Sequence, residues 1–214
     1  MSELPLFPLR AVLFPHIQLP LHVFEPRYQA LIRNCQDNAG NFGVVAIRSG
    51  LEVGGPAEPE SMGTEAIISN LQPLSEGRFN VVVTGRRRFQ IKTLIADRPY
   101  LRADVELLED LAPDPASFIL ACEARSALSQ YTTALTRITG RVASTIPLPT
   151  DPLILSWVIA ATLVVEGAHQ QRLLEQASVS QRLRLEIELL KREATLLDLD
   201  LANRLQLVPT YGRN

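Results

Sequence analysis

The stretch LPLFPLRAVLFPHIQLPLHVFEPRY, residues 4–28, decides how the amino-terminal part of this chain folds. Its apolar residues come in short runs that are interrupted by prolines at positions 5, 8, 15 and 20. Because proline has no backbone N–H and holds the preceding residue in an extended conformation, these runs are predicted to be short β-strands separated by turns. Residues 25–38 then place apolar side chains at helical spacing, which predicts one amphipathic helix.

The β-rich pattern continues to about residue 112. Residues 48–61 are rich in glycine, proline and glutamate and are expected to form a mobile loop. Further strands are predicted at residues 42–48, 64–74, 77–85, 87–96 and 100–110. Short antiparallel strands at regular spacing are typical of a barrel or a sandwich, so residues 1–112 are predicted to form one β-rich domain.

Helix signals begin after residue 112. Asp114–Pro115 and Asp151–Pro152 each combine an N-cap with a proline at the first helical position. They predict one helix that ends near Thr139, before Gly140, and a second helix that ends near Glu166.

A short helix at residues 169–177 precedes a long last helix, which starts at a capping box formed by Ser178 and Gln181. The last helix carries a seam of apolar residues at alternating spacings of four and three: Leu183, Ile187, Leu190, Ala194, Leu197 and Leu201. Such a seam packs against another helix, either within the chain or in a weak dimer. We therefore predict an α+β protein with a helical bundle over residues 113–208 and a tail at 209–214.

The composition limits the classes of function. The chain has 214 residues and a net charge of −2, so no overall positive field attracts nucleic acid or an acidic membrane. The longest apolar run, residues 153–165, is too short to span a bilayer, and the amino terminus lacks the pattern of a signal peptide, so we expect a cytoplasmic protein. Cys35 and Cys122 are expected to be buried free thiols, and we predict neither a metal site nor a cofactor.

Three segments, in this order along the chain, resemble the N-terminal substrate-binding domain of the Lon protease family. Residues 4–28 are similar to its opening, and MGTEAIISNLQPLSEGRFNVVVTGRRRFQI (62–91) is similar to its central strands. DPLILSWVIAATL and HQQRLLEQASVSQRLRLEIELLKRE resemble its helical end. The resemblance implies a PUA-like β pseudo-barrel followed by a helical bundle. It also implies a role in binding unfolded or partner polypeptide.

The chain differs from full-length Lon proteases in what it lacks. It contains no GxxxxGK[ST] motif, and the dipeptide Gly-Lys does not occur. A Ser–Lys peptidase would need Lys92, which has the solvent-facing parity of its strand, or Lys191, which follows a seam position. The resemblance therefore implies a free-standing binding module that is not an enzyme. Assignment of the chain as a Lon-type hydrolase would rest only on a label inherited from the family.

The segment VVVTGRRRFQI contains three consecutive arginines, Arg86, Arg87 and Arg88. Strand parity turns Arg87 inward, whereas the resemblance singles out Arg88 through its G-x-x-R-F motif, and a bulge at Gly85 would reconcile the two. A buried arginine needs a partner, and the predicted partner is Glu25, at a helix start in the same domain. The alternative is that the three arginines bind phosphate, as in a PUA-like RNA-binding module.

Candidate contacts for a polypeptide lie at the turn that follows the first apolar runs. Phe14 and Ile17 are predicted to be exposed on a strand edge that proline interrupts, where an extended peptide can add as a strand. The alternative is that both belong to the core. His16 either lines the same groove or is solvated at the turn. No catalytic residue is predicted.

Overall fold

The structure is a computed structural model that describes residues 2–37, 40–55, 57–140 and 147–206. The chain divides into two compact units, one with Met1–Leu111 and Ala160–Ala177, the other with Ala112–Ile159 and Ser178–Asn214. The first unit gives way to the second after Leu111, close to the domain boundary predicted after residue 112. The helical half, in contrast, is not one continuous unit, because the segment that contains α4 (Gly167–Glu175) returns to the first unit. The predicted tail at 209–214 lies outside the described residues.

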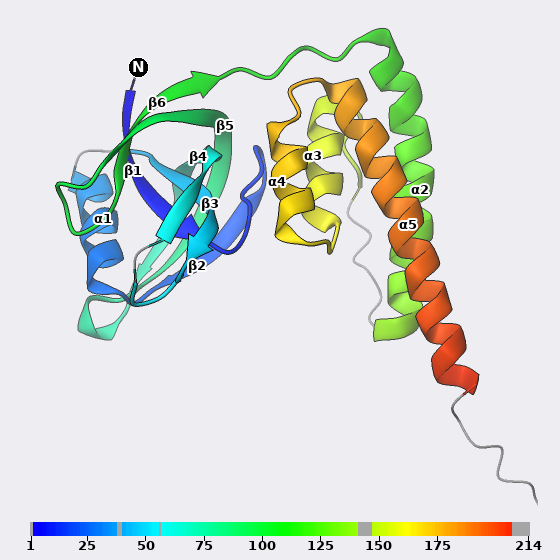
Figure 1. Cartoon of the computed structure of the whole chain (residues 1–214), viewed down its shortest axis with the longest axis horizontal. Coiled ribbons are helices and arrows are strands. Elements are labelled where there is room, and N and C mark those ends of the chain that lie inside the picture. Colours follow the sequence, from blue (N-terminus) through cyan, green and yellow to red (C-terminus); the bar gives the residue numbers. More distant parts are fainter. Residues whose placement is uncertain (1, 38–39, 56, 141–146, 207–214) are drawn as a thin grey trace, which may run out of the picture. The chain divides into compact units, whose positions relative to one another are not determined.

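The first unit is built on a six-stranded sheet (Figure 1). Its strands are β1 (Ser2–Leu9), β2 (Gln18–Val23), β3 (Phe42–Gly50), β4 (Ala57–Pro73), β5 (Phe79–Ile95) and β6 (Arg102–Leu108). The order is β2-β5-β4-β3-β1-β6, and β5 also pairs with β6, which closes all the strands except β2 into a ring. Only β1 and β3 run parallel among these pairs. This mixed sheet with helices confirms the α+β class.

The helix α1 (Pro26–Asp37) covers part of the core of the first unit. It buries the four residues that its periodicity predicts: Tyr28, Leu31, Ile32 and Cys35. The ring of Tyr28 stacks on that of Phe7 from β1, with centroids 4.1 Å apart. A second buried cluster contains Leu4 and Leu6 of β1 together with Phe89 of β5. Neighbouring residues of β1 thus serve two clusters, because successive side chains point to opposite faces of a strand.

β5 runs unbroken through Gly85, where the sequence predicted a turn between two strands. Gly85 is required for a close approach, because a Cβ at this position would overlap the carbonyl oxygen of Phe14. Its backbone holds the loop that precedes β2: Gly85 N donates to Ile17 O at 2.9 Å, and His16 N donates to Gly85 O at 2.8 Å.

A β-bulge follows Gly85 directly. Ala66 of β4 pairs with Gly85 and Thr64 pairs with Arg88, so β5 has one residue more than β4 between these two pairs. The extra residue changes which side chains point inward. Arg88 is therefore the buried arginine, with 2% of its surface exposed, while Arg87 is half-buried. Arg88, which the family motif singles out, is therefore buried. Arg87, which strand parity without a bulge would turn inward, is not.

Arg88 connects the barrel to α4 within the first unit. Its Nη2 lies 2.9 Å from Asp110 Oδ1, and its Nη1 donates to the carbonyl oxygen of Leu174 at 3.2 Å. Nearby, Gln171 Nε2 donates to the carbonyl oxygen of Met62 at 3.2 Å. These contacts place the short helix against β4 and β5.

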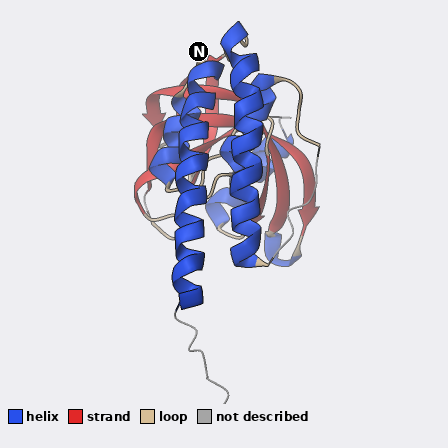
Figure 2. Ribbon diagram, turned by 90° about the vertical axis from the view of Figure 1, so that its right-hand side faces the viewer, coloured by secondary structure: helices blue, strands red, loops and turns tan. Residues whose placement is uncertain are grey.

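The second unit contains α2 (Pro115–Thr139), most of α3 (Pro152–Thr162) and α5 (Val179–Gln206). Both predicted ends of α2 are confirmed: Asp114 Oδ1 accepts from Ser117 N at 2.8 Å, and Gly140 has a φ of 66°. Figure 2 shows α2 and α5 as two long helices side by side. The seam of α5 is buried at Leu183, Ile187 and Leu190 and half-buried beyond them.

Several local predictions differ from the structure. α3 ends at Thr162, one turn before the predicted end. β4 begins at Ala57, inside the segment expected to be a loop, because it pairs with the end of β3. Cys35 is buried, but Cys122 is exposed on α2. No described helix is long and apolar enough to cross a membrane.

Replacement of Gly85 by alanine is expected to lower the free energy of unfolding by about 2 kcal/mol, because the new methyl group meets backbone that cannot rotate away. Gly167→Ala is the matched control, since a Cβ there meets nothing within 4 Å and lies in the first turn of α4. Urea unfolding of both variants measures the difference. Equal stability would contradict the close approach at Gly85.

Replacement of Arg88 by methionine is expected to lower the free energy of unfolding by about 3 kcal/mol, because it leaves Asp110 without its cationic partner. Arg86→Met, at the exposed neighbour, is expected to change it by less than about 0.5 kcal/mol. The same unfolding measurement separates the two. A small effect at Arg88 would mean that the pair contributes nothing to stability.

Candidate functional site

Of the three predicted contact residues at the turn before β2, only His16 is exposed. Phe14 is 1% exposed and belongs to the core, so its prediction as an exposed contact is wrong. Ile17 is half-buried, and its carbonyl is bound to Gly85. His16 is exposed, with a left-handed φ of 65° that lets its backbone N–H reach β5. The three residues instead dock the loop on β5.

Glu25 is not the partner of the buried arginine. It pairs with Arg27, two residues away, at 3.0 Å. Arg88 pairs with Asp110, and Arg87 contacts Glu65 and Glu109, both at 3.2 Å. The expectation that Arg87 and Arg88 have carboxylate partners holds, but the predicted partner is wrong, because a local pair at the start of α1 satisfies Glu25.

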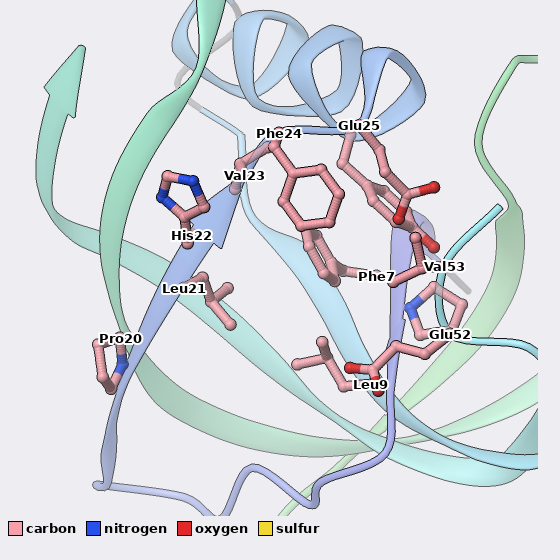
Figure 3. Close-up of a pocket in the computed structure, with 12 residues that line it drawn as sticks. Phe7, Leu9, Pro20, Leu21, His22, Val23, Phe24, Glu25, Glu52 and Val53 are labelled. Carbon is pink, nitrogen blue, oxygen red and sulfur yellow. The ribbon is translucent and has the colours of Figure 1, made fainter. Parts of the chain in front are cut away.

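A pocket of about 200 Å³ lies between β1 and β2 in the first unit (Figure 3). β1 and β2 contribute most of its wall, and the start of α1 and the loop after β3 contribute the rest. The residues that line it are Phe7, Pro8, Leu9, Pro20, Leu21, His22, Val23, Phe24, Glu25, Tyr28, Glu52 and Val53. In Figure 3, the side chains of Phe7, Leu9, Leu21 and Phe24 gather between the two strands.

The two strands that flank the pocket have no strand between them in the described part of the chain. β1 pairs with β6 through residues 2–5 and with β3 through residues 6–9, so beyond Leu6 one edge of β1 has no strand partner. β2 pairs with β5 alone, so its other edge is also unpaired. The pocket therefore lies between two free strand edges.

Prolines occupy both free edges. Gly85 N binds Ile17 O, and because backbone groups alternate along an antiparallel ladder, Leu21 faces β5 and Pro20 faces away from it. On β1, Leu6 N donates to Leu101 O at 2.7 Å, away from β3, so the backbone of Pro8 also points away from β3, beyond the residues that pair with β6. Each proline thus lacks its N–H where no ladder bond exists, which is where a sheet tolerates proline.

Arg27 fixes the loop that forms one wall of the pocket. Its guanidinium donates to Glu25 Oε2 at 3.1 Å, to Gly55 O at 3.1 Å and to Glu52 O at 3.2 Å. Glu25 Oε2 also accepts from Gly54 N at 3.3 Å. The side chain of Arg27 therefore joins the start of α1 to residues 52–55. These contacts hold the wall in place without a ligand.

Tyr28, in the wall nearest to α1, is uncharged at neutral pH. The guanidinium of Arg27 lies 4.5 Å from the ring centroid of Tyr28. Burial raises the pKa of the Tyr28 hydroxyl above its usual value, although the Arg27 charge opposes this rise. The phenol therefore stays protonated and adds no charge to the pocket.

The rim of the pocket is apolar with one uncompensated charge. Phe24 is 47% exposed and Val53 is 55% exposed, which is unusual for side chains of this size so close together. Arg27 neutralises Glu25, whereas no ion pair of Glu52 occurs among the described residues. No cluster of potential metal ligands occurs in the same part of the chain. The arrangement is able to hold an apolar side chain and a nearby cation.

Sequence reasoning missed Phe7, Phe24, Glu52 and Val53 as members of this site. The positions of Pro8 and Pro20 carried the usable signal, because proline marks a strand edge without a ladder partner. Which edges face each other depends on the pairing of β1 and β2 with distant strands, and that pairing is not visible in the local sequence.

Comparison with known proteins gives consistent matches. The family described as "ATP-dependent protease La (LON) substrate-binding domain" matches residues 3–192. The Lon protease of Anaeromyxobacter dehalogenans is 30% identical over 202 residues, which are 92% of this chain but 24% of that relative. The chain therefore spans about a quarter of the length of the curated relative.

Two solved structures share the fold. The Lon N-terminal domain protein from Xanthomonas campestris superposes with a TM-score of 0.64 at 26% identity, over 86% of this chain and 96% of that one. The N-terminal domain of the Mycobacterium avium complex Lon protease has a TM-score of 0.67 at 21% identity, over 88% and 98% of the two chains. Each comparison covers almost the whole solved domain.

Replacement of Arg27 by methionine is expected to release the loop at residues 52–55, because two backbone carbonyls lose their donor. The amide of Gly54 should then exchange with solvent about tenfold faster, measured by hydrogen–deuterium exchange. Arg48→Met removes an exposed ion pair with Glu58 and serves as the control. Unchanged exchange at Gly54 would show that Arg27 does not hold the loop.

Proposed function

The chain belongs to the family of LON substrate-binding domains, and from this membership we propose that it is a non-catalytic module that binds unfolded or partner polypeptide. The pocket between β1 and β2 is the proposed contact site. The observation that carries the proposal is the combination of two unpaired strand edges with exposed apolar side chains, Phe24 and Val53, at one pocket.

The size of the pocket favours a polypeptide over a metabolite. Pockets that enclose small molecules have volumes of roughly 300–1,000 Å³, and the pocket here has about 200 Å³. A single apolar side chain fits such a space, and the exposed rim adds further apolar contact. Affinity should be modest and should depend weakly on salt, because burial of apolar surface is the main favourable contribution.

The alternative, an RNA-binding module that uses Arg86, Arg87 and Arg88, has less support. Arg88 is buried with Asp110, and Arg87 contacts two carboxylates. Only Arg86 of the three is exposed. The triplet is therefore not a patch of three solvent-facing cations, which is the feature that suggested phosphate binding.

The test is fluorescence anisotropy with a labelled, permanently unfolded polypeptide at ~50 and ~200 mM salt, with labelled single-stranded RNA in parallel. We expect saturable polypeptide binding that changes little with salt. Phe24→Ala should weaken it about fivefold, because Phe24 loses apolar contact area. Leu94→Ala is the matched control, since Leu94 is 46% exposed on β5 and lies outside the pocket.

Three outcomes would contradict the proposal in different ways. Absence of polypeptide binding at both salt concentrations would refute the function. Binding that Phe24→Ala and Leu94→Ala leave equally strong would refute the site. RNA binding that collapses at the higher salt concentration and depends on Arg86 would favour the alternative.

A further inference from the structure

We propose that the occupant of the pocket is an extended segment that adds as a strand to the free edge of β2. An apolar side chain of the segment would lie in the pocket, and a lysine or arginine two residues away, on the same face of the segment, would lie beside Glu52. This inference rests on the proposed polypeptide-binding function and specifies how the polypeptide is recognised.

The free edge of β2 offers backbone groups at the correct spacing. Because Leu19, Leu21 and Val23 bond to β5, the backbone groups of Pro20 and His22 point away from it. Beside the pocket, whose lining on β2 begins at Pro20, this edge therefore presents the carbonyl of Pro20 and both the N–H and the carbonyl of His22. A segment paired with it gives two donors and one acceptor, all from alternate residues of the segment.

The opposite wall of the pocket, formed by β1, offers the segment a further hydrogen-bond acceptor. Pro8 of β1 presents a carbonyl and no N–H on its unpaired side. Beside the pocket, the incoming strand thus finds acceptors on both sides and a donor only at His22. Long generic strand pairing is prevented, because an edge interrupted by proline cannot continue a ladder.

The side chains of the segment are selected by shape and charge. In a strand, alternate side chains point to the same face, so one side chain enters the pocket and its neighbours point away. The pocket walls are apolar at Phe7, Leu21 and Tyr28. Glu52 is the acidic side chain of the wall that has no ion pair among the described residues, so a cation on the same face, two residues from the buried side chain, is favoured.

The test uses a labelled peptide, Thr-Ser-Leu-Thr-Lys-Thr-Ser, in which Leu and Lys share one face of a strand, and a series of variants that each carry one N-methylated backbone amide. Fluorescence anisotropy measures binding to the full chain. Strand addition predicts a period of two: methylation should weaken binding about tenfold or more at alternate residues and little at those between. A flat profile with binding retained would overturn strand addition and leave the proposed function intact.

Charge selection is tested with the same peptide and a variant in which glutamine replaces lysine. Glu52→Gln should weaken binding of the lysine peptide about threefold and leave the glutamine peptide unaffected. Glu188→Gln removes an equal charge from an exposed position on α5 and is the control. Equal effects of Glu52→Gln on both peptides would overturn the charge assignment. If neither these peptides nor an unfolded polypeptide binds, the proposed function fails together with this inference.

Discussion

β5 changes its neighbour at Gly85, and the rest of the first unit depends on this change. On one edge, β5 pairs with β2 up to Thr84 and with β6 from Arg88 onward. One edge cannot hold two strands at the same residues, so β2 ends outside the ring that β6 completes. The loop that leads into β2 crosses β5 at its single glycine, where the backbone of Phe14 approaches most closely. The bulge at this point also turns Arg88 inward, towards Asp110 and α4.

Local signals in the sequence were sufficient for the ends of α2 and for the buried face of α1, though not for the end of α3. The ends of α2 depend on Asp114 and Gly140, and both act through contacts with residues of the same helix. The buried face of α1 follows from spacing alone. The strands were harder, because the sequence on either side of Gly85 has the form of a turn. Only pairing with β4 and with the loop before β2 shows that this glycine permits a close approach.

The arginines show a similar limit. That a buried arginine must have a carboxylate partner follows from the cost of an isolated buried charge, and the structure agrees. The choice of partner does not follow from this rule. Glu25 has Arg27 two residues away, and a pair this close in sequence needs no distant contact to form. Asp110 is brought to Arg88 only when β6 pairs with the end of β5. Sequence therefore predicts the need for a partner, while topology decides its identity.

The same prolines that define the pocket also limit what it binds. A free strand edge is an aggregation hazard, because any extended chain with matching N–H and C=O groups can pair with it. Pro8 and Pro20 each remove one backbone donor from their edges, so only a short extended segment can pair beside the pocket. Few backbone hydrogen bonds are then available, so a ligand must gain most of its affinity from the apolar surface around Phe24 and Val53. An edge of this kind distinguishes ligands by the side chain that enters the pocket, and it makes few demands on the rest of the segment. Under the proposed function, this geometry favours recognition of many unrelated segments, each by one apolar residue and a cation on the same face.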